Sequence, residues 1–225
     1  MSWLTETLTS TLGRKVIMAL TGIFLILFLA VHLTGNLQLL KNDGGEAFNI
    51  YAEFMSTNPL IQFVSKGNFF FILLHVLISI FLTRKNRQAR PVSYQVAVKS
   101  ETSTWSSRNM GILGTLIFVF LIIHLKGFWY EMHFGQIPYK NYDGFEARDL
   151  YAVVDQAFSQ WYWVAVYLVG MLAVAFHLSH GFQSAFQTLG LNHVKYSPAI
   201  RFVGLAFAIL VPAGFAAIPI MMFFT

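Results

Sequence analysis

Histidines are the residues of this chain whose type and spacing point to chemistry. Five of the seven lie in long apolar stretches that contain no Asp or Glu: His32, His75, His124, His177 and His180. An ionisable side chain within a bilayer is costly, and it normally faces a bundle interior beside a partner. Neutral imidazole is also a common metal ligand. These five histidines are therefore candidate ligands of a buried metal or cofactor.

The composition shows what surrounds these histidines. Of the 225 residues, 56% are hydrophobic, 16% are aromatic and 11% are charged, with a mean hydropathy of +0.59. Soluble domains carry roughly 25% charged residues, so this chain has too many apolar side chains for one water-soluble core. It is predicted to be an integral membrane protein that contacts lipid. The absence of cysteine excludes thiolate-bound iron–sulfur clusters and covalently attached c-type haem.

Five elements must position the histidines. The apolar stretches match the roughly 20 residues of a spanning helix and cover 16–40, 60–83, 109–130, 161–187 and 199–225. Asn58 and Pro59 resemble an N-cap and a first-turn proline, which favours a second helix that begins near residue 60. We expect an all-α membrane protein, a single domain over 1–225 with five transmembrane helices.

The distribution of positive charge predicts the orientation. With five spans, ten Lys and Arg residues fall on one side, namely Arg14, Lys15, Arg84, Lys85, Arg87, Arg90, Lys99, Arg108, Lys195 and Arg201. Five fall on the other side, namely Lys41, Lys66, Lys126, Lys140 and Arg148. The positive-inside rule makes the first side cytoplasmic, which places the N-terminus inside a bacterial-type inner membrane. The same rule accounts for the net charge of +5, so no nucleic-acid partner is expected.

Helix rise converts spacing into depth. His32 lies 17 residues beyond Lys15 and His124 lies 16 beyond Arg108, so both sit about 25 Å from the cytoplasmic edge. His177 lies 16 residues after Trp161, the outer start of its helix, and therefore falls in the inner half. Nine residues separate His75 from both Lys66 and Arg84, which leaves its level open.

Two histidines at one level and two at another would form two bis-imidazole sites. Haem iron takes one axial imidazole on each face, so this pattern predicts a helix bundle that encloses two stacked b-type haems. The i, i+3 spacing leaves His177 and His180 as alternative ligands in the fourth helix.

Three stretches carry a resemblance to a known family: GRKVIMALTGIFLILFLAVHLTGNLQ (13–38), FLIIHLKGFWYEMHFG (120–135) and FHLSHGFQSAFQTLG (176–190). The chain resembles, over its whole length, the di-haem cytochrome b membrane anchor of succinate dehydrogenase and fumarate reductase, respiratory complex II. In that family a ligand histidine is followed by glycine four residues later and by another nine beyond that. His177, Gly181 and Gly190 fit this motif, which favours His177 over His180.

The resemblance implies a function as well as a ligand set. It pairs His32 with His124 at the outer haem and His75 with His177 at the inner haem. It implies two haem b cofactors, flavoprotein and iron–sulfur partner subunits, and a quinone, with menaquinone favoured. The chain would pass electrons between the iron–sulfur subunit and quinone in the respiratory chain, downstream of the tricarboxylic acid cycle. It would not oxidise succinate itself.

Other polar residues are secondary candidates. Arg14, Lys15, Trp105 and Arg108 end helices on the inner side, where they could bind inner-haem propionates or simply anchor the chain at the interface. Glu53, in an expected outer loop from Ile50 to Leu60, is a candidate proton group for quinone or an exposed carboxylate. His133 and His193 lie outside the spans and are expected to be solvated.

Two other functions compete with this hypothesis. A di-haem cytochrome b of a hydrogenase or formate dehydrogenase would use the same ligands with a different partner. A non-haem transporter would use the histidines to line a polar path, although the sequence shows no repeated halves typical of such proteins.

Overall fold

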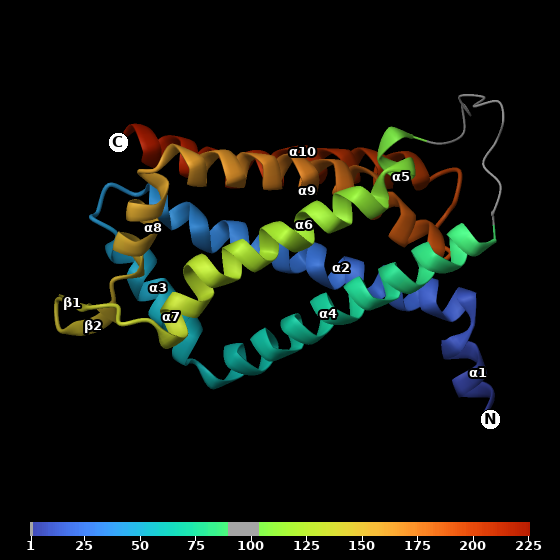
Figure 1. Ribbon diagram of the computed structural model, residues 1–225, viewed down its shortest axis with the longest axis horizontal. Helices are drawn as coiled ribbons and strands as arrows, with labels where there is room; N and C mark the ends of the chain where they lie inside the picture. The colour runs from blue at the N-terminus through green and yellow to red at the C-terminus, as the bar shows by residue number, and fades with distance from the viewer. Residues whose placement is uncertain (1, 90–103) are drawn as a thin grey trace.

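The computed structural model of the chain describes residues 2–89 and 104–225 and is almost entirely helical. Its long helices run roughly side by side between two ends (Figure 1). We call these the N-terminal end and the hairpin end, after the N-terminus and the small β-hairpin. The helical segments of the first half are α1 (Trp3–Thr9), α2 (Thr11–Asn36), η1 (Leu37–Leu40), α3 (Glu46–Thr57) and α4 (Pro59–Gln88).

The second half contains the hairpin and the remaining helices. Its elements are α5 (Trp105–Arg108), α6 (Met110–His124), η2 (Leu125–Trp129), α7 (Tyr130–Phe134), β1 (Tyr139–Tyr142), β2 (Phe145–Arg148), α8 (Leu150–Phe158), α9 (Trp161–Thr188) and α10 (Ser197–Phe224).

Five helical segments are long and apolar enough to cross a membrane: Thr11–Leu40, Pro59–Gln88, Met110–Phe134, Trp161–Thr188 and Ser197–Phe224. The length and composition of these helices confirm the predicted all-α membrane protein with five spans. The start predicted for the second span is confirmed as well. The Asn58 side chain accepts hydrogen bonds from the backbone N–H groups of Leu60 and Ile61, and Pro59 is the first helical residue.

The third span differs from the prediction at its end. It continues past Tyr130 to Phe134 because η2, a π-helical turn, joins α6 to α7 without a break. His133 therefore lies on the last turn of this helix, where it is exposed. His193 lies in the connection between α9 and α10 and is exposed as expected.

The predicted outer loop from Ile50 to Leu60 is wrong. Residues of this segment form most of α3, which is followed directly by α4. Two glycines in the left-handed conformation, Gly44 and Gly45, make the turn into α3. The hairpin was not predicted. In it, β1 pairs with β2 in antiparallel register through a turn at Asp143 and Gly144.

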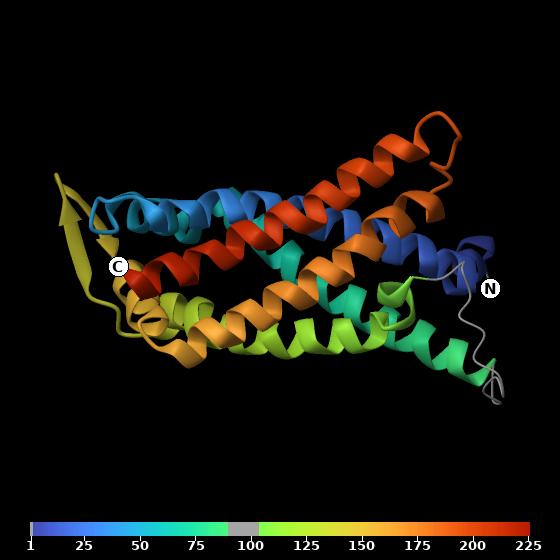
Figure 2. The ribbon, with the colours of Figure 1, turned by 90° about the horizontal axis from the view of Figure 1, so that it is seen from above.

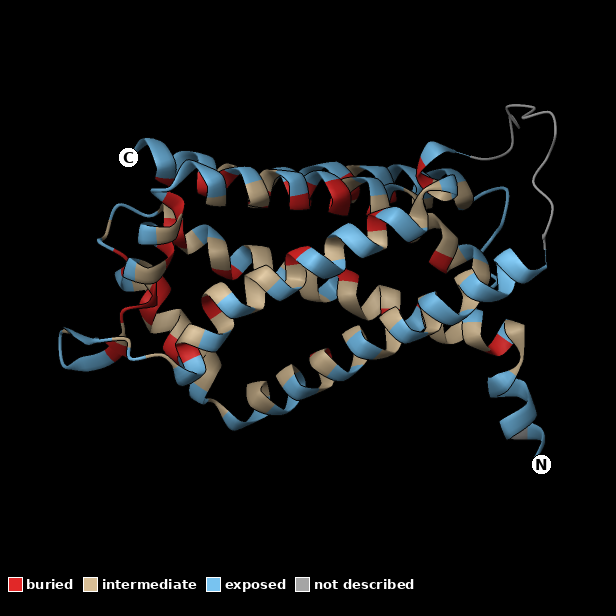
Figure 3. Cartoon of the chain, in the orientation of Figure 1, coloured by how far each residue is buried: buried red, intermediate tan, exposed pale blue. Residues whose placement is uncertain are grey.

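Packing is unequal among the five long helices. α9 packs most extensively against α10 and also contacts α2 and α6, as the view from above shows (Figure 2). Buried positions are accordingly frequent on α9 and α10 and sparse on α4 (Figure 3). The one buried residue of α4 is Asn68, and its Oδ1 has no hydrogen-bond partner within the described residues. α4 therefore contributes little apolar core, although it carries His75.

Candidate functional site

The first histidine pair joins α2 to α6. The ring centroids of His32 and His124 lie 5.8 Å apart with an interplanar angle of 87°. Phe28 stacks on His32 at 5.1 Å, and Phe120 stacks on His124 at 5.8 Å. Aromatic side chains therefore surround this pair, which lies toward the hairpin end of both helices.

The second pair joins α4 to α9. The ring centroids of His75 and His177 lie 6.4 Å apart with an interplanar angle of 64°. The structure thus brings together the same two pairs that the family resemblance implies. His177, and not His180, faces His75, while His180 is partly buried and belongs to neither ring pair. Whether these residues bind haem stays a prediction.

The spacing within each pair fits two imidazoles that share one iron. A metal–imidazole bond is about 2 Å long, so two rings on opposite faces of one metal have centroids about 6 Å apart. Aromatic rings also pack at this distance without a metal. Both pairs therefore have the spacing that a shared iron requires, and ordinary aromatic packing has it as well. The hydrogen bonds of the rings are a second, independent indication.

A hydroxyl group from a third position bonds one ring of each pair. The Nδ1 of His75 lies 3.0 Å from the Oγ1 of Thr21, and the Nδ1 of His124 lies 2.8 Å from the Oη of Tyr167. Histidines that bind metals usually use their second nitrogen in such a bond. The Nε2 of each ring is then available for a ligand. Thr21 and Tyr167 were not among the residues predicted from the sequence.

The other two rings are less firmly held. The Nδ1 of His177 is buried and has no hydrogen-bond partner within the described residues. The Nδ1 of His32 has only the Nδ2 of Asn36, at 3.3 Å, and that amide donates mainly to the His32 carbonyl at 2.7 Å. A buried nitrogen without a partner is costly, so the Nδ1 of His177 has an unmet capacity for a hydrogen bond.

A metal ion that is held by protein side chains alone would need more ligands than the two histidines of either pair. Within residues 2–89 and 104–225 there is no group of three or more His, Cys, Asp or Glu residues that could hold a metal ion. Two imidazoles suit a metal whose other ligands come from a macrocycle, as in haem. The residues present therefore fit haem better than a bare zinc or iron ion.

The candidate propionate partners lie near the N-terminal end. The Arg14 guanidinium stacks 3.5 Å above the centre of the Phe81 ring, and Trp105 meets Phe176 edge-on at 5.2 Å. Lys15 and Arg108 are exposed. The stacked Arg14 joins α2 to α4, which agrees with an anchoring role, and the predicted contact of these four residues with a cofactor stays a prediction.

Glu53 is neither in a loop nor exposed. Its carboxylate accepts hydrogen bonds from Nε and Nη2 of Arg148 at 2.9 and 3.1 Å, and Arg148 also donates to Ser56 and to the Met132 carbonyl. Burial alone raises the pKa of Glu53, but the hydrogen bonds and charge of Arg148 outweigh it and hold the pKa below its usual value. Glu53 is therefore an ionised partner that joins α3 to the hairpin.

A second buried network lies beside this ion pair. Asn49 is 0% exposed and its side chain donates to Tyr142 and Asp149 while it accepts from the backbone N–H of Tyr151. Lys140 pairs with Asp149 at 2.7 Å. These bonds fasten α3, the hairpin and α8 together across the hairpin end of the bundle.

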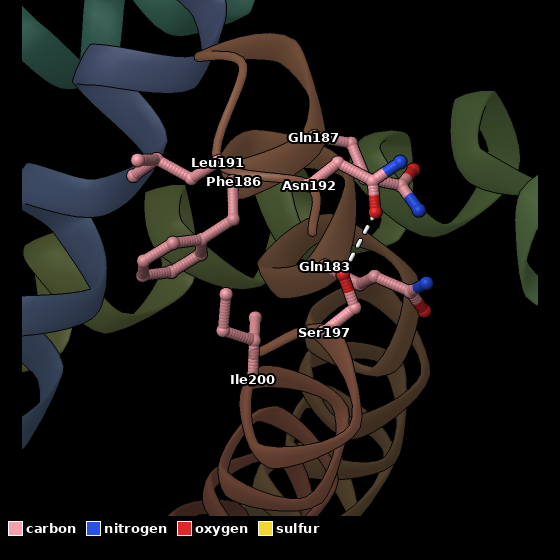
Figure 4. Close-up of a pocket in the computed structure, with 7 residues that line it drawn as sticks. All are labelled: Gln183, Phe186, Gln187, Leu191, Asn192, Ser197 and Ile200. Atoms are coloured by element: carbon pink, nitrogen blue, oxygen red, sulfur yellow. Dashed lines mark hydrogen bonds between the residues drawn. The ribbon is translucent and has the colours of Figure 1, made fainter. Parts of the chain in front are cut away.

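A small cleft lies at the turn between α9 and α10 (Figure 4). Gln183 and Asn192 lie on one side and Phe186 and Ile200 on the other. It contains no histidine and begins six residues beyond His177, so we do not assign the chemistry of the chain to it.

No protein family, curated protein or solved structure matches this chain.

Proposed function

We propose that the chain is a membrane cytochrome b that binds two haems, one between His32 and His124 and one between His75 and His177. The observation that carries this proposal is the pair of histidine contacts, which join four different helices at two levels of one apolar bundle. Bis-histidine haem iron supplies one-electron transfer without a change in ligands.

The protein residues provide the binding sites and their surroundings. Phe28 and Phe120 stack on the rings of the first pair and give it apolar neighbours. Glu131, on the last turn of the third span, is the only Asp or Glu in the five described spans, so protons would be exchanged at an end of the bundle rather than along a buried carboxylate chain.

We further propose the role that the sequence resemblance implies. The chain would be the membrane anchor of a succinate:quinone oxidoreductase, with flavoprotein and iron–sulfur subunits on the N-terminal end. That end carries Arg84, Lys85 and Arg87 on the last turns of α4, while Arg90 and Lys99 lie outside the described residues. Two electrons and two protons would convert quinone to quinol, and menaquinone is the favoured quinone.

Haem content tests this proposal. The protein is purified with its natural partners, and a dithionite-reduced-minus-oxidised spectrum is combined with pyridine haemochrome quantification. Two haems b per chain, partly reducible by succinate, are expected. A colourless protein would instead favour the transporter hypothesis, and a nickel or molybdenum partner subunit would favour the hydrogenase or formate dehydrogenase hypothesis.

A further inference from the structure

The hydroxyl groups of Thr21 and Tyr167 each form a hydrogen bond with a histidine of one proposed haem site. Thr21 is 2% exposed and Tyr167 is 7% exposed, so neither hydroxyl is bonded to bulk water. Each reaches the Nδ1 of a histidine on another helix, from α2 to α4 and from α9 to α6.

The surroundings of Thr21 decide which atom carries the proton in its bond to His75. The Thr21 Oγ1 lies 2.9 Å from the Ile17 carbonyl and 3.0 Å from the Met18 carbonyl, and both of these can only accept. The hydroxyl has a single hydrogen, and we assign it to these two carbonyls as a shared bond. Thr21 then accepts from His75, so His75 carries its proton on Nδ1 and has a free lone pair on Nε2.

Tyr167 is placed differently. Its hydroxyl has His124 as its one hydrogen-bond partner among the described residues, so it can donate or accept. A ligand on the Nε2 of His124 requires the proton on Nδ1, and Tyr167 must then accept. The two bonds therefore differ in strength, because the Thr21 oxygen is polarised by its own donation to a carbonyl and the Tyr167 oxygen is not.

The two hydroxyls also cross-connect the pairs. α2 supplies His32 to one pair and Thr21 to the other, while α9 supplies His177 to one pair and Tyr167 to the other. Each pair thus has one histidine supported by a helix that provides a ligand to the other pair.

We propose that Thr21 and Tyr167 are positioning residues that set the ligand strength of the two haem sites separately, Thr21 at the His75–His177 site and Tyr167 at the His32–His124 site. The proposal rests on the proposed function. A hydrogen bond accepted from Nδ1–H makes Nε2 a stronger donor, which stabilises oxidised iron and lowers the reduction potential. Loss of either hydroxyl should raise the potential of its own site, and loss of Thr21 should have the larger effect.

Potentiometric titration of the purified complex tests the proposal with Thr21→Val and Tyr167→Phe, which remove one hydroxyl each and keep the shape. Each potential is assigned with variants that lack one histidine pair. Thr21→Val is expected to raise only the potential of the His75–His177 site, and Tyr167→Phe only that of the His32–His124 site. Thr21→Ser should restore the original value because it keeps the hydroxyl.

Matched controls are Thr34→Val, an exposed threonine of α2 that bonds only its own helix, and Tyr162→Phe, an exposed tyrosine of α9. Neither should move a potential. Unchanged potentials in both test variants, or equal shifts at both sites, would overturn the proposal while two haems per chain would still uphold the proposed function. A wild-type chain without haem would instead defeat the proposed function.

If either test variant fails to assemble, the reduced wild-type protein provides the measurement. Histidine labelled with ¹⁵N should show Nδ1–H protons on His75 and His124 that exchange slowly with solvent. Rapid exchange, or the proton on Nε2 of either ring, would contradict the proposed hydrogen bonds.

Discussion

At the scale of single residues, the ion pair of Glu53 and Arg148 is a largely buried polar contact that joins α3 to the hairpin. Their side chains are 12% and 19% exposed, so removal of one partner leaves a largely buried charge without compensation. We expect Arg148→Met to lower the free energy of unfolding by about 3 kcal/mol. Denaturation in mild detergent measures this loss.

A double-variant cycle provides the control. Glu53→Gln combined with Arg148→Met should cost less than the sum of the two single changes, because the second change removes the uncompensated charge. Additive losses would mean that the two side chains do not interact as the structure indicates.

The same pair predicts a pH dependence. The pKa of Glu53 in the folded chain is held below its ordinary value of 4.5 by Arg148. Its contribution to stability is therefore complete above that ordinary value and is lost as the pH falls through the folded value. Stability measured by thermal unfolding should decline below about pH 4.5, and the decline should be shallower in Glu53→Gln. Identical pH profiles would contradict this assignment.

Glu53 was also a candidate proton group for quinone. As an ionised partner of Arg148 it could take up a proton only if that ion pair opened, so we expect Glu53→Gln to retain quinone reductase turnover wherever the variant folds. A loss of turnover in a fully assembled variant would return Glu53 to the mechanism.

At the scale of elements, the close packing of α9 against α6 positions the residues around His124. A Cβ added to Gly170 of α9 would lie 2.6 Å from the Phe120 ring of α6, and that ring stacks on His124. Gly170→Ala should therefore displace Phe120, cost roughly 1–3 kcal/mol and disturb the first histidine pair more than the second.

Gly111→Ala is the matched control. Gly111 lies on α6, the helix that carries Phe120, and an added Cβ would meet only Thr83, at an ordinary contact distance of 4.0 Å. Thermal unfolding and haem spectra should therefore change in Gly170→Ala and stay near wild type in Gly111→Ala. Equal effects of the two changes would show that packing at Gly170 is not special.

The elements also show what the sequence could reveal. Long apolar runs and the cap at Asn58 predict the five spans because a spanning helix is a local, compositional property. The hairpin had a local signal too, since Asp-Gly between strands is a strong turn dipeptide, but it was overlooked. The Glu53–Arg148 bond could not be predicted, because it joins residues 95 apart whose meeting depends on tertiary packing.

The histidine pairs could be predicted from the sequence only in part. Helix rise alone set His32 and His124 at one level, but the level of His75 depended on the family resemblance. The contact of Thr21 with His75 fixes that level in the structure. Side-chain partners such as Thr21 and Tyr167 are common residue types in any helix, so spacing identifies them only after the histidine pairs are known.

At the scale of the whole molecule, charge predicts how the bundle lies in the membrane. The excess of Lys and Arg at the N-terminal end predicts that this end is cytoplasmic. The chain has no cysteine, so single cysteines report topology without background. Ser2→Cys should resist a membrane-impermeant thiol reagent in intact cells, while Asp143→Cys, in the hairpin turn, should react. The opposite labelling pattern would invert the orientation.

The proposed function requires that four histidines form two independent haem sites with fixed partners, and haem counts in paired variants test this requirement. His32→Ala/His124→Ala removes one complete pair and should retain one haem per chain, whereas His32→Ala/His75→Ala removes one ligand from each pair and should retain none. His180→Ala should keep two. One haem in the cross-pair variant, or none in the within-pair variant, would contradict the pairing of His32 with His124 and of His75 with His177.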